Sequence, residues 1–171
     1  MSDLRSILIF LFLLPAVSLA QTVHVDNEKI VYKGDIKLNA GNRNDAYAEA
    51  KNLLLNYVNA SPDSLKEDKD EKLLASTAVI RLPSPYHLKK QLLCTVKFKP
   101  KDDEISYEIT NVVLKVQERG EKPRLIPSHF LLKKMDENGN VARETEKQLN
   151  EIDMYIQRMI GLMKSATVMN K

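Results

Sequence analysis

The chain has 171 residues, of which 43% are hydrophobic and 29% charged, a composition typical of a globular protein with a packed core. Its 26 basic and 23 acidic residues nearly cancel, so no strong attraction to nucleic acid or to anionic lipid is expected. Cys94 is the single cysteine, which excludes an internal disulfide. The fold must therefore depend on its hydrophobic core.

Residues 1–20 have the layout of a secretory signal peptide. A basic residue precedes the apolar run Ile7–Leu14, and the small residues Ser18 and Ala20 lie just before a cleavage point at Gln21. The apolar run is shorter than the ~20 residues that a membrane-spanning helix needs. This favours a cleaved signal peptide over the alternative, an uncleaved membrane anchor.

After cleavage, we expect residues 21–171 to form a single α+β domain with no stable membrane span. The mature protein is then exported, either to the periplasm or to the extracellular medium. The sequence does not distinguish these two locations, and it does not indicate an oligomeric state.

The first elements of the mature chain are a strand, a helix and a second strand. Val, Ile and Tyr are enriched over Lys29–Leu38, which predicts a strand. Apolar residues recur at helical spacing over Asp45–Val58 and predict an amphipathic helix. Asn59–Lys72 has the composition of a polar linker, and Leu73–Leu82 is the next expected strand. Two prolines predict a loop over residues 83–90.

A β-hairpin is predicted over Leu92–Ile109, with Pro100–Asp103 as its loop. Beyond Asn111 the apolar phase shifts by one residue, which predicts a β-bulge near Asn111–Val112. One side of the hairpin should face the core, and the other side should face solvent. The expected cross-strand pairs are Lys99 with Glu104, Phe98 with Ile105, Val96 with Tyr107 and Cys94 with Ile109.

The remainder of the chain ends in a second amphipathic helix, expected at about residues 143–165. Residues 118–127 read as a loop, and Ser128–Asn140 as either a short strand or a helix that ends in a turn. The element order is β-α-β-β-β-α. It predicts an α+β fold in which two amphipathic helices pack on one face of an antiparallel sheet of about four strands.

Three segments resemble the family called domain of unknown function 4468: Lys29–Val58, Thr77–Leu82 and Cys94–Val116. The resemblance covers about residues 29–117, and the closing helix fits it as well. It implies a fold like that of the TATA-binding protein and an origin in the bacterial envelope. It supplies no catalytic residues. The chain departs from the family pattern in having no Trp, where members often carry one late in the first helix.

The sequence predicts no catalytic, cofactor-binding or metal site. Cys94 shares its phase with apolar neighbours, so a core thiol is favoured over a nucleophile. Asp102 and Asp103 lie at a hairpin tip in solvent, so turn residues are favoured over a pair of carboxylates for acid–base catalysis. Asp136–Asn140 resembles the start of a calcium-binding loop, but the Gly and Glu that such a loop needs later are missing. The three histidines, whose spacing matches no metal-ligand motif, are His24, His87 and His129.

The polar side of the hairpin is the surface on which a binding site is predicted. Thr95, Lys97, Lys99 and Glu108 share this side, and Lys115 joins them if the bulge re-aims the strand. The alternative is a sheet face that only keeps the protein soluble. Nucleic acid is not the expected partner, because the face has no interleaved aromatic residues.

These features favour a non-catalytic binding or protein-interaction module of the bacterial envelope, whose partner is an envelope protein or a small ligand. The alternative is a carrier that holds a small or lipidic ligand between the helices and the sheet. Methionines support this alternative because they adapt to varied ligands, although they also fill ordinary cores. The methionines of the last helix are Met154, Met159, Met163 and Met169. A hydrolase is the weakest hypothesis.

Overall fold

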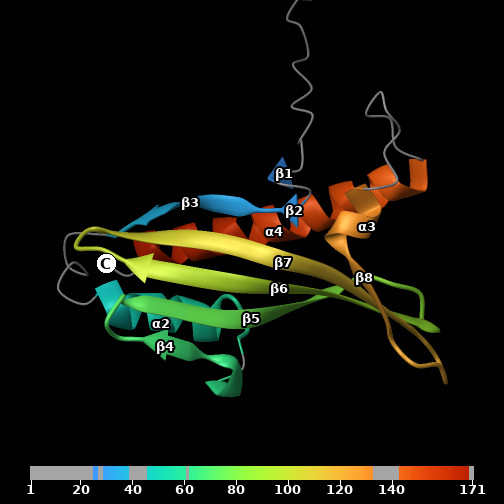
Figure 1. Cartoon of the computed structure of the whole chain (residues 1–171), viewed down its shortest axis with the longest axis horizontal. Coiled ribbons are helices and arrows are strands. Elements are labelled where there is room, and N and C mark those ends of the chain that lie inside the picture. Colours follow the sequence, from blue (N-terminus) through green and yellow to red (C-terminus); the bar gives the residue numbers. More distant parts are fainter. Residues whose placement is uncertain (1–24, 27–28, 39–45, 61, 133–142, 170–171) are drawn as a thin grey trace, which may run out of the picture.

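The computed structural model describes residues 25–26, 29–38, 46–60, 62–132 and 143–169 (Figure 1). The strands are β1 (Val25–Asp26), β2 (Lys29–Ile30), β3 (Tyr32–Lys37), β4 (Lys66–Asp68), β5 (Leu73–Leu82), β6 (Leu88–Pro100), β7 (Glu104–Glu118) and β8 (Arg124–Pro127). The helices are α2 (Ala46–Asn56), the short 3₁₀ helix η2 (Pro62–Ser64), α3 (Ser128–Leu132) and α4 (Arg143–Met169). Together they form an α+β fold, as predicted.

The main sheet has six antiparallel strands in the order β3-β7-β6-β5-β4, with β8 paired to β7. β3 pairs with the first half of β7, and β8 pairs with its second half, so both lie on the same side of β7. β1 and β2 form a separate two-stranded ribbon. Among the described residues, no helix is both long enough and apolar enough to cross a membrane.

Both long helices lie on one face of the sheet, as predicted, with α2 near β5 and β6 and α4 near β3 (Figure 1). Alternate side chains of the strands point toward the helices and form the core with them. Leu53 and Leu54 of α2 and Ile156 of α4 are completely buried in this core. The completely buried strand residues are Ile30, Leu74, Ala78, Leu92, Val96, Phe98, Ile105 and Ile109.

The two helices follow the apolar spacing of the sequence. The buried residues of α2 are Ala46, Ala50, Leu53 and Leu54, at the spacing of a single helical stripe. α4 buries Ile152 and adjacent apolar residues in the same way, and it extends to Met169 rather than ending near residue 165.

The faces of the central hairpin are as predicted, but its register is wrong by two residues. Phe98 pairs with Tyr107 rather than with Ile105, and Lys97 pairs with Glu108. The difference arises because Pro100 continues the strand and lies opposite Ile105. Proline is tolerated at the end of a strand, where its missing N–H breaks no ladder bond. A shift of two residues keeps every side chain on its own face.

The β-bulge is confirmed at Asn111–Val112. Leu93 pairs with Val113 and Thr95 pairs with Thr110, so two residues of β7 lie opposite Cys94. Asn111 has a φ of 52°, a left-handed conformation that Asn tolerates better than most residues. The bulge reverses the phase of β7 and keeps Val112 and Leu114 in the core.

The prediction of about four strands was wrong, because β4 and β8 lie in segments that were interpreted as a linker and a loop. All three residues of β4 are exposed, so this strand has no alternating apolar pattern. It is held by contacts between Glu67 and helix α2: the Tyr47 hydroxyl donates to Glu67 at 2.9 Å, and Lys51 Nζ lies 2.7 Å from the same carboxylate. These two contacts lower the pKa of Glu67, with the Lys51 hydrogen bond the larger cause.

Gly34 is required by the aromatic ring that lies against it. A Cβ atom added to Gly34 would lie 2.6 Å from the hydroxyl oxygen of Tyr107 and 2.9 Å from its Cζ. We expect Gly34→Ala to lower the free energy of unfolding by about 2 kcal/mol, because the buried ring must move. Chemical denaturation would measure this change. Gly161→Ala is the matched control: it meets no atom within 4 Å, and in a helix it should raise stability by about 1 kcal/mol. Equal effects at the two sites would contradict the steric explanation.

Candidate functional site

The predicted binding residues lie on the face of the sheet that points away from α2 and α4. We call this the open face, and it is formed by the alternate strand residues that do not enter the core. Thr95, Lys97, Lys99 and Glu108 all belong to it, as the registers of β6 and β7 show. Lys115 joins them opposite Gln91, because the bulge has reversed the phase of β7. The sharing of one face is therefore confirmed, whereas a role in binding stays a prediction.

Ion pairs and hydrogen bonds connect these polar residues across the strands. Glu108 lies 3.6 Å from Lys97 and 3.3 Å from Lys33 of β3, so one carboxylate faces two ammonium groups. Asn111 Nδ2 donates to Thr95 Oγ1 at 3.3 Å. Lys99 lies one step further along, opposite Ser106. Because these groups are exposed or half-buried, their pairs contribute little to stability and remain available to a partner.

Sequence reasoning missed a row of apolar side chains that crosses the same open face. Val79, Leu93, Val113 and Pro127 lie opposite one another on β5, β6, β7 and β8. Val79 is 38% exposed, and Leu93, Val113 and Pro127 are half-buried. The row was missed because it depends on the register of four strands. We call Val79, Leu93, Val113 and Pro127 the apolar row.

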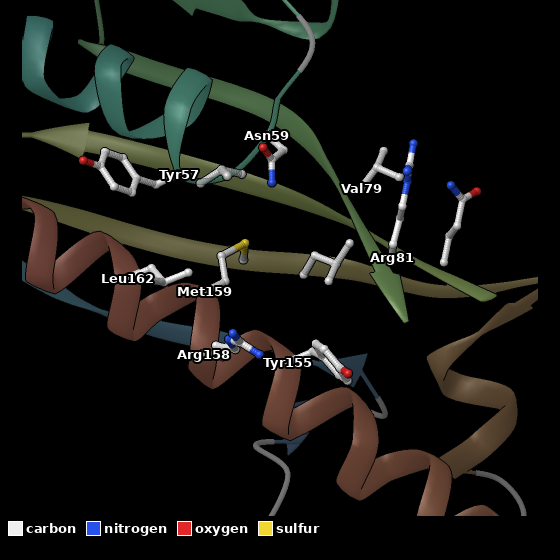
Figure 2. Close-up of a pocket in the computed structure, with 11 residues that line it drawn as sticks. Tyr57, Asn59, Val79, Arg81, Tyr155, Arg158, Met159 and Leu162 are labelled. Carbon is white, nitrogen blue, oxygen red and sulfur yellow. The ribbon is translucent and has the colours of Figure 1, made fainter. Parts of the chain in front are cut away.

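A groove of about 620 Å³ lies between the end of α2, the middle of α4 and the edge of β5, where Val79 and Arg81 of the open face also line it (Figure 2). We call it the inter-helix groove. Met159 and Leu162 lie on its α4 side, and Leu162 is 50% exposed. The charged residues of its lining are two arginines, Arg81 and Arg158, with no carboxylate among them. The lining consists of Tyr57, Val58, Asn59, Val79, Ile80, Arg81, Gln91, Tyr155, Arg158, Met159 and Leu162.

The methionines of α4 divide between the groove and the core. Met159 lines the inter-helix groove, whereas Met163 is completely buried in the core and Met154 is 51% exposed. The Met169 side chain lies outside the described ones. The space between the helices and the sheet is thus filled by side chains, and the groove lies at its rim.

A buried polar cluster lies beneath α4. The Tyr32 hydroxyl donates a hydrogen bond of 2.9 Å to Asp153 Oδ1, and both residues are less than 5% exposed. The pKa of the Tyr32 hydroxyl is raised. Burial is the largest cause, and the negative charge of Asp153 is the second. Burial also raises the pKa of the Cys94 thiol to about 12. A protonated, buried thiol is a poor nucleophile.

The other candidate residues remain apart from one another. His87 lies in an exposed loop, and His129 lies in α3 with its ring 4.3 Å from that of Phe130. Asp102 and Asp103 are exposed at the hairpin tip. His24 and residues 136–140 lie outside the described part of the chain. Within that part, no three His, Cys, Asp or Glu side chains gather in an arrangement that could hold a metal ion.

This fold is shared with several solved structures. A TBP-like protein from Parabacteroides distasonis has a TM-score of 0.63 and 12% sequence identity, with 87% of this chain and 99% of that chain covered. A DUF4468 family protein from Bacteroides ovatus has a TM-score of 0.64 and 9% identity, with 89% and 93% covered. The sequence matches no family model and no functionally curated protein. The TBP-like fold implied by the resemblance is therefore confirmed, and at these identities the likeness concerns the fold alone.

Proposed function

We propose that this chain, which has the TBP-like fold, is a non-catalytic interaction module that is exported to the bacterial envelope. The observation that carries the proposal is the open face, on which the apolar row lies between rows of charged and polar residues. Surfaces that bind other proteins commonly combine an apolar centre with a polar rim. Export is supported by the features of residues 1–20 in the sequence.

The open face is suited to a protein partner more than to a small molecule. It is a broad surface spread over several strands; Thr95, Lys97 and Leu93 line none of the described pockets, and Val79 lines the inter-helix groove at the edge of this face. A small ligand is normally held in a concave site that covers most of its surface. The partner is expected to place apolar side chains on the apolar row and charged groups on Lys97 and Glu108.

The carrier of a small or lipidic ligand is the second candidate, and the inter-helix groove supports it. Its volume of about 620 Å³ lies within the usual range of ligand pockets. However, the core beneath the groove is filled, since Leu53, Leu92 and Ile156 are completely buried. A ligand would therefore lie at the rim and not between the helices and the sheet.

Native mass spectrometry of the protein purified from its own envelope fraction tests both candidates. We expect a complex that contains a second protein, and we expect its population to fall about tenfold when Leu93 and Val113 are both changed to Thr, because two apolar contacts are lost. Both substitutions suit a strand, so the fold should persist. Val25→Thr, at an exposed apolar residue of β1, is the control and should leave the complex intact.

The other outcomes of this experiment are equally informative. Added mass of a few hundred daltons, lost on denaturation, would support the carrier and contradict the interaction module. A bare monomer, or a complex that is unaffected by the two substitutions, would contradict the assignment to the open face. The mass of the chain itself shows whether cleavage has occurred before Gln21.

A further inference from the structure

The second half of strand β5 has a free edge. β4 pairs with Leu73–Ala75 and with no further residue of β5, so Ser76–Leu82 has no described strand on its outer side (Figure 1). In an antiparallel strand, alternate residues direct both their N–H and C=O groups to the outer side. None of the described turn and loop backbone hydrogen bonds involves Ser76–Leu82. This edge therefore presents backbone donors and acceptors that are unoccupied among the described residues.

Most of this edge is also unprotected, since its charged residue, Arg81, and the following Pro83 lie at one end of it. Proteins usually guard an edge strand with a charge, a proline or a bulge, because an exposed edge pairs readily with another chain. The run Ser76–Ile80 has none of these features: it reads Ser-Thr-Ala-Val-Ile and pairs with β6 in unbroken register. Thr77 is exposed and Val79 is 38% exposed, so the edge can be reached from solvent.

The inter-helix groove adjoins this edge and would receive the side chains of an added strand. Val79, Ile80 and Arg81 line the groove together with Met159 and Leu162 of α4. Figure 2 shows Val79 and Arg81 pointing away from α4, whereas Met159 lies on the α4 side of the groove. An added strand would thus alternate between two environments, since its side chains point alternately to the two faces of the sheet.

The charges near this edge indicate which kind of chain could bind to it. Arg81 is exposed on the open-face side of β5, and Arg158 is exposed on α4. Neither arginine forms an ion pair with a described residue. A second copy of the chain, paired through the same edge, would offer no carboxylate to Arg81, because Ser76–Leu82 contains no acidic residue. An acidic side chain on the open-face side of an added strand would instead meet an uncompensated cation at Arg81.

We propose that the Ser76–Leu82 edge of β5 binds an extended acidic peptide segment of a partner protein, which adds to the sheet as a further strand. Backbone hydrogen bonds to β5 would give affinity, and the inter-helix groove would select apolar residues at alternate positions. Acidic residues between them would lie beside Arg81. This site goes beyond the proposed function, because it uses the backbone edge of β5 and the groove; it shares Val79 with the apolar row but does not use Leu93 or Val113.

A labelled peptide of alternating Glu and Val, matched in length to Ser76–Leu82, tests the proposal by fluorescence anisotropy. We expect saturable binding that is lost when alternate backbone nitrogens of the peptide are methylated, because methylation removes the hydrogen-bond donors. A peptide of alternating Lys and Val should bind at least about fivefold more weakly, since it meets Arg81 with a like charge. Amide hydrogen exchange should slow in Ser76–Leu82 when the acidic peptide is added.

Substitutions separate this site from other surfaces. Arg81→Glu should weaken binding of the acidic peptide about fivefold, whereas Arg124→Glu, the same charge change in β8, should not. The Leu93→Thr and Val113→Thr variant should bind the peptide normally, so that failure of the open face and failure of this edge are distinguishable. Absence of binding at millimolar peptide, equal binding of the methylated peptide, or exchange protection elsewhere would overturn the proposal.

Discussion

Raising the pH from 9 to 12 is expected to lower the free energy of unfolding by about 3 kcal/mol through Cys94 alone. Burial raises the pKa of this thiol to about 12 in the folded protein, whereas an unfolded cysteine ionises near 9. Between these values the unfolded chain has released the proton and the folded chain has kept it. Stability therefore falls as pH rises, by about 1.4 kcal/mol per pH unit. Below about pH 8 both states are protonated, and the contribution of Cys94 does not change.

Chemical denaturation at a series of pH values, with a reductant present, would measure this slope. Cys94→Ala is the matched variant, because it leaves a small cavity whose cost does not depend on pH. The variant should keep its stability up to about pH 10. Beyond that value the raised pKa of Tyr32 makes a contribution of the same sign, since the unfolded tyrosine then ionises first. If the free energy of unfolding of Cys94→Ala fell between pH 9 and pH 10 as steeply as that of the wild type, the thiol would not be responsible.

Tyr32→Phe is expected to destabilise the protein by about 3 kcal/mol, although it removes a single oxygen atom. The Tyr32 hydroxyl donates to Asp153 at 2.9 Å, and Asp153 is 2% exposed. The substitution leaves a buried carboxyl group without this donor, and a buried polar group that loses its partner keeps the full cost of desolvation. Urea denaturation of the wild type and the variant at neutral pH would measure the difference.

Two further variants test this explanation of the Tyr32 effect. Tyr155→Phe is the control, because Tyr155 is half-buried on α4, the helix that carries Asp153. This substitution should cost less than about 0.5 kcal/mol. Combining Tyr32→Phe with Asp153→Leu removes both polar groups and should recover much of the lost stability. A double variant that is less stable than Tyr32→Phe would indicate that Asp153 has another stabilising role.

The sequence predicted those parts of the fold in which burial leaves a periodic pattern. β5 has the expected bounds, and the bulge at Asn111–Val112 is signalled by a change of apolar phase. β4 and β8 leave no such pattern, because their residues are exposed or only half-buried. Their pairing is decided by neighbouring strands and, for β4, by the contacts of Glu67 with α2. The hairpin register was wrong because Pro100 is compatible with both a loop and a strand end.

The same distinction applies to the candidate sites. The shared face of Thr95, Lys97 and Glu108 follows from alternation along two strands, so it was predictable. The apolar row depends on the register of four strands, and the inter-helix groove depends on where α2 ends relative to α4. Met159 was a predicted ligand-lining residue and does line the groove, but its spacing alone could not separate it from the buried Met163.

The hydrogen bond between Tyr32 and Asp153 also bears on how long the native state persists. It joins the first strand of the main sheet to the last helix, across 121 positions of the chain. The β6–β7 hairpin, in contrast, pairs segments that are neighbours in sequence, so it can form before the long loop that returns to β3 is closed. Contacts that form after the transition state control the rate of unfolding and not the rate of folding. The buried pair would therefore act mainly on the lifetime of the folded protein.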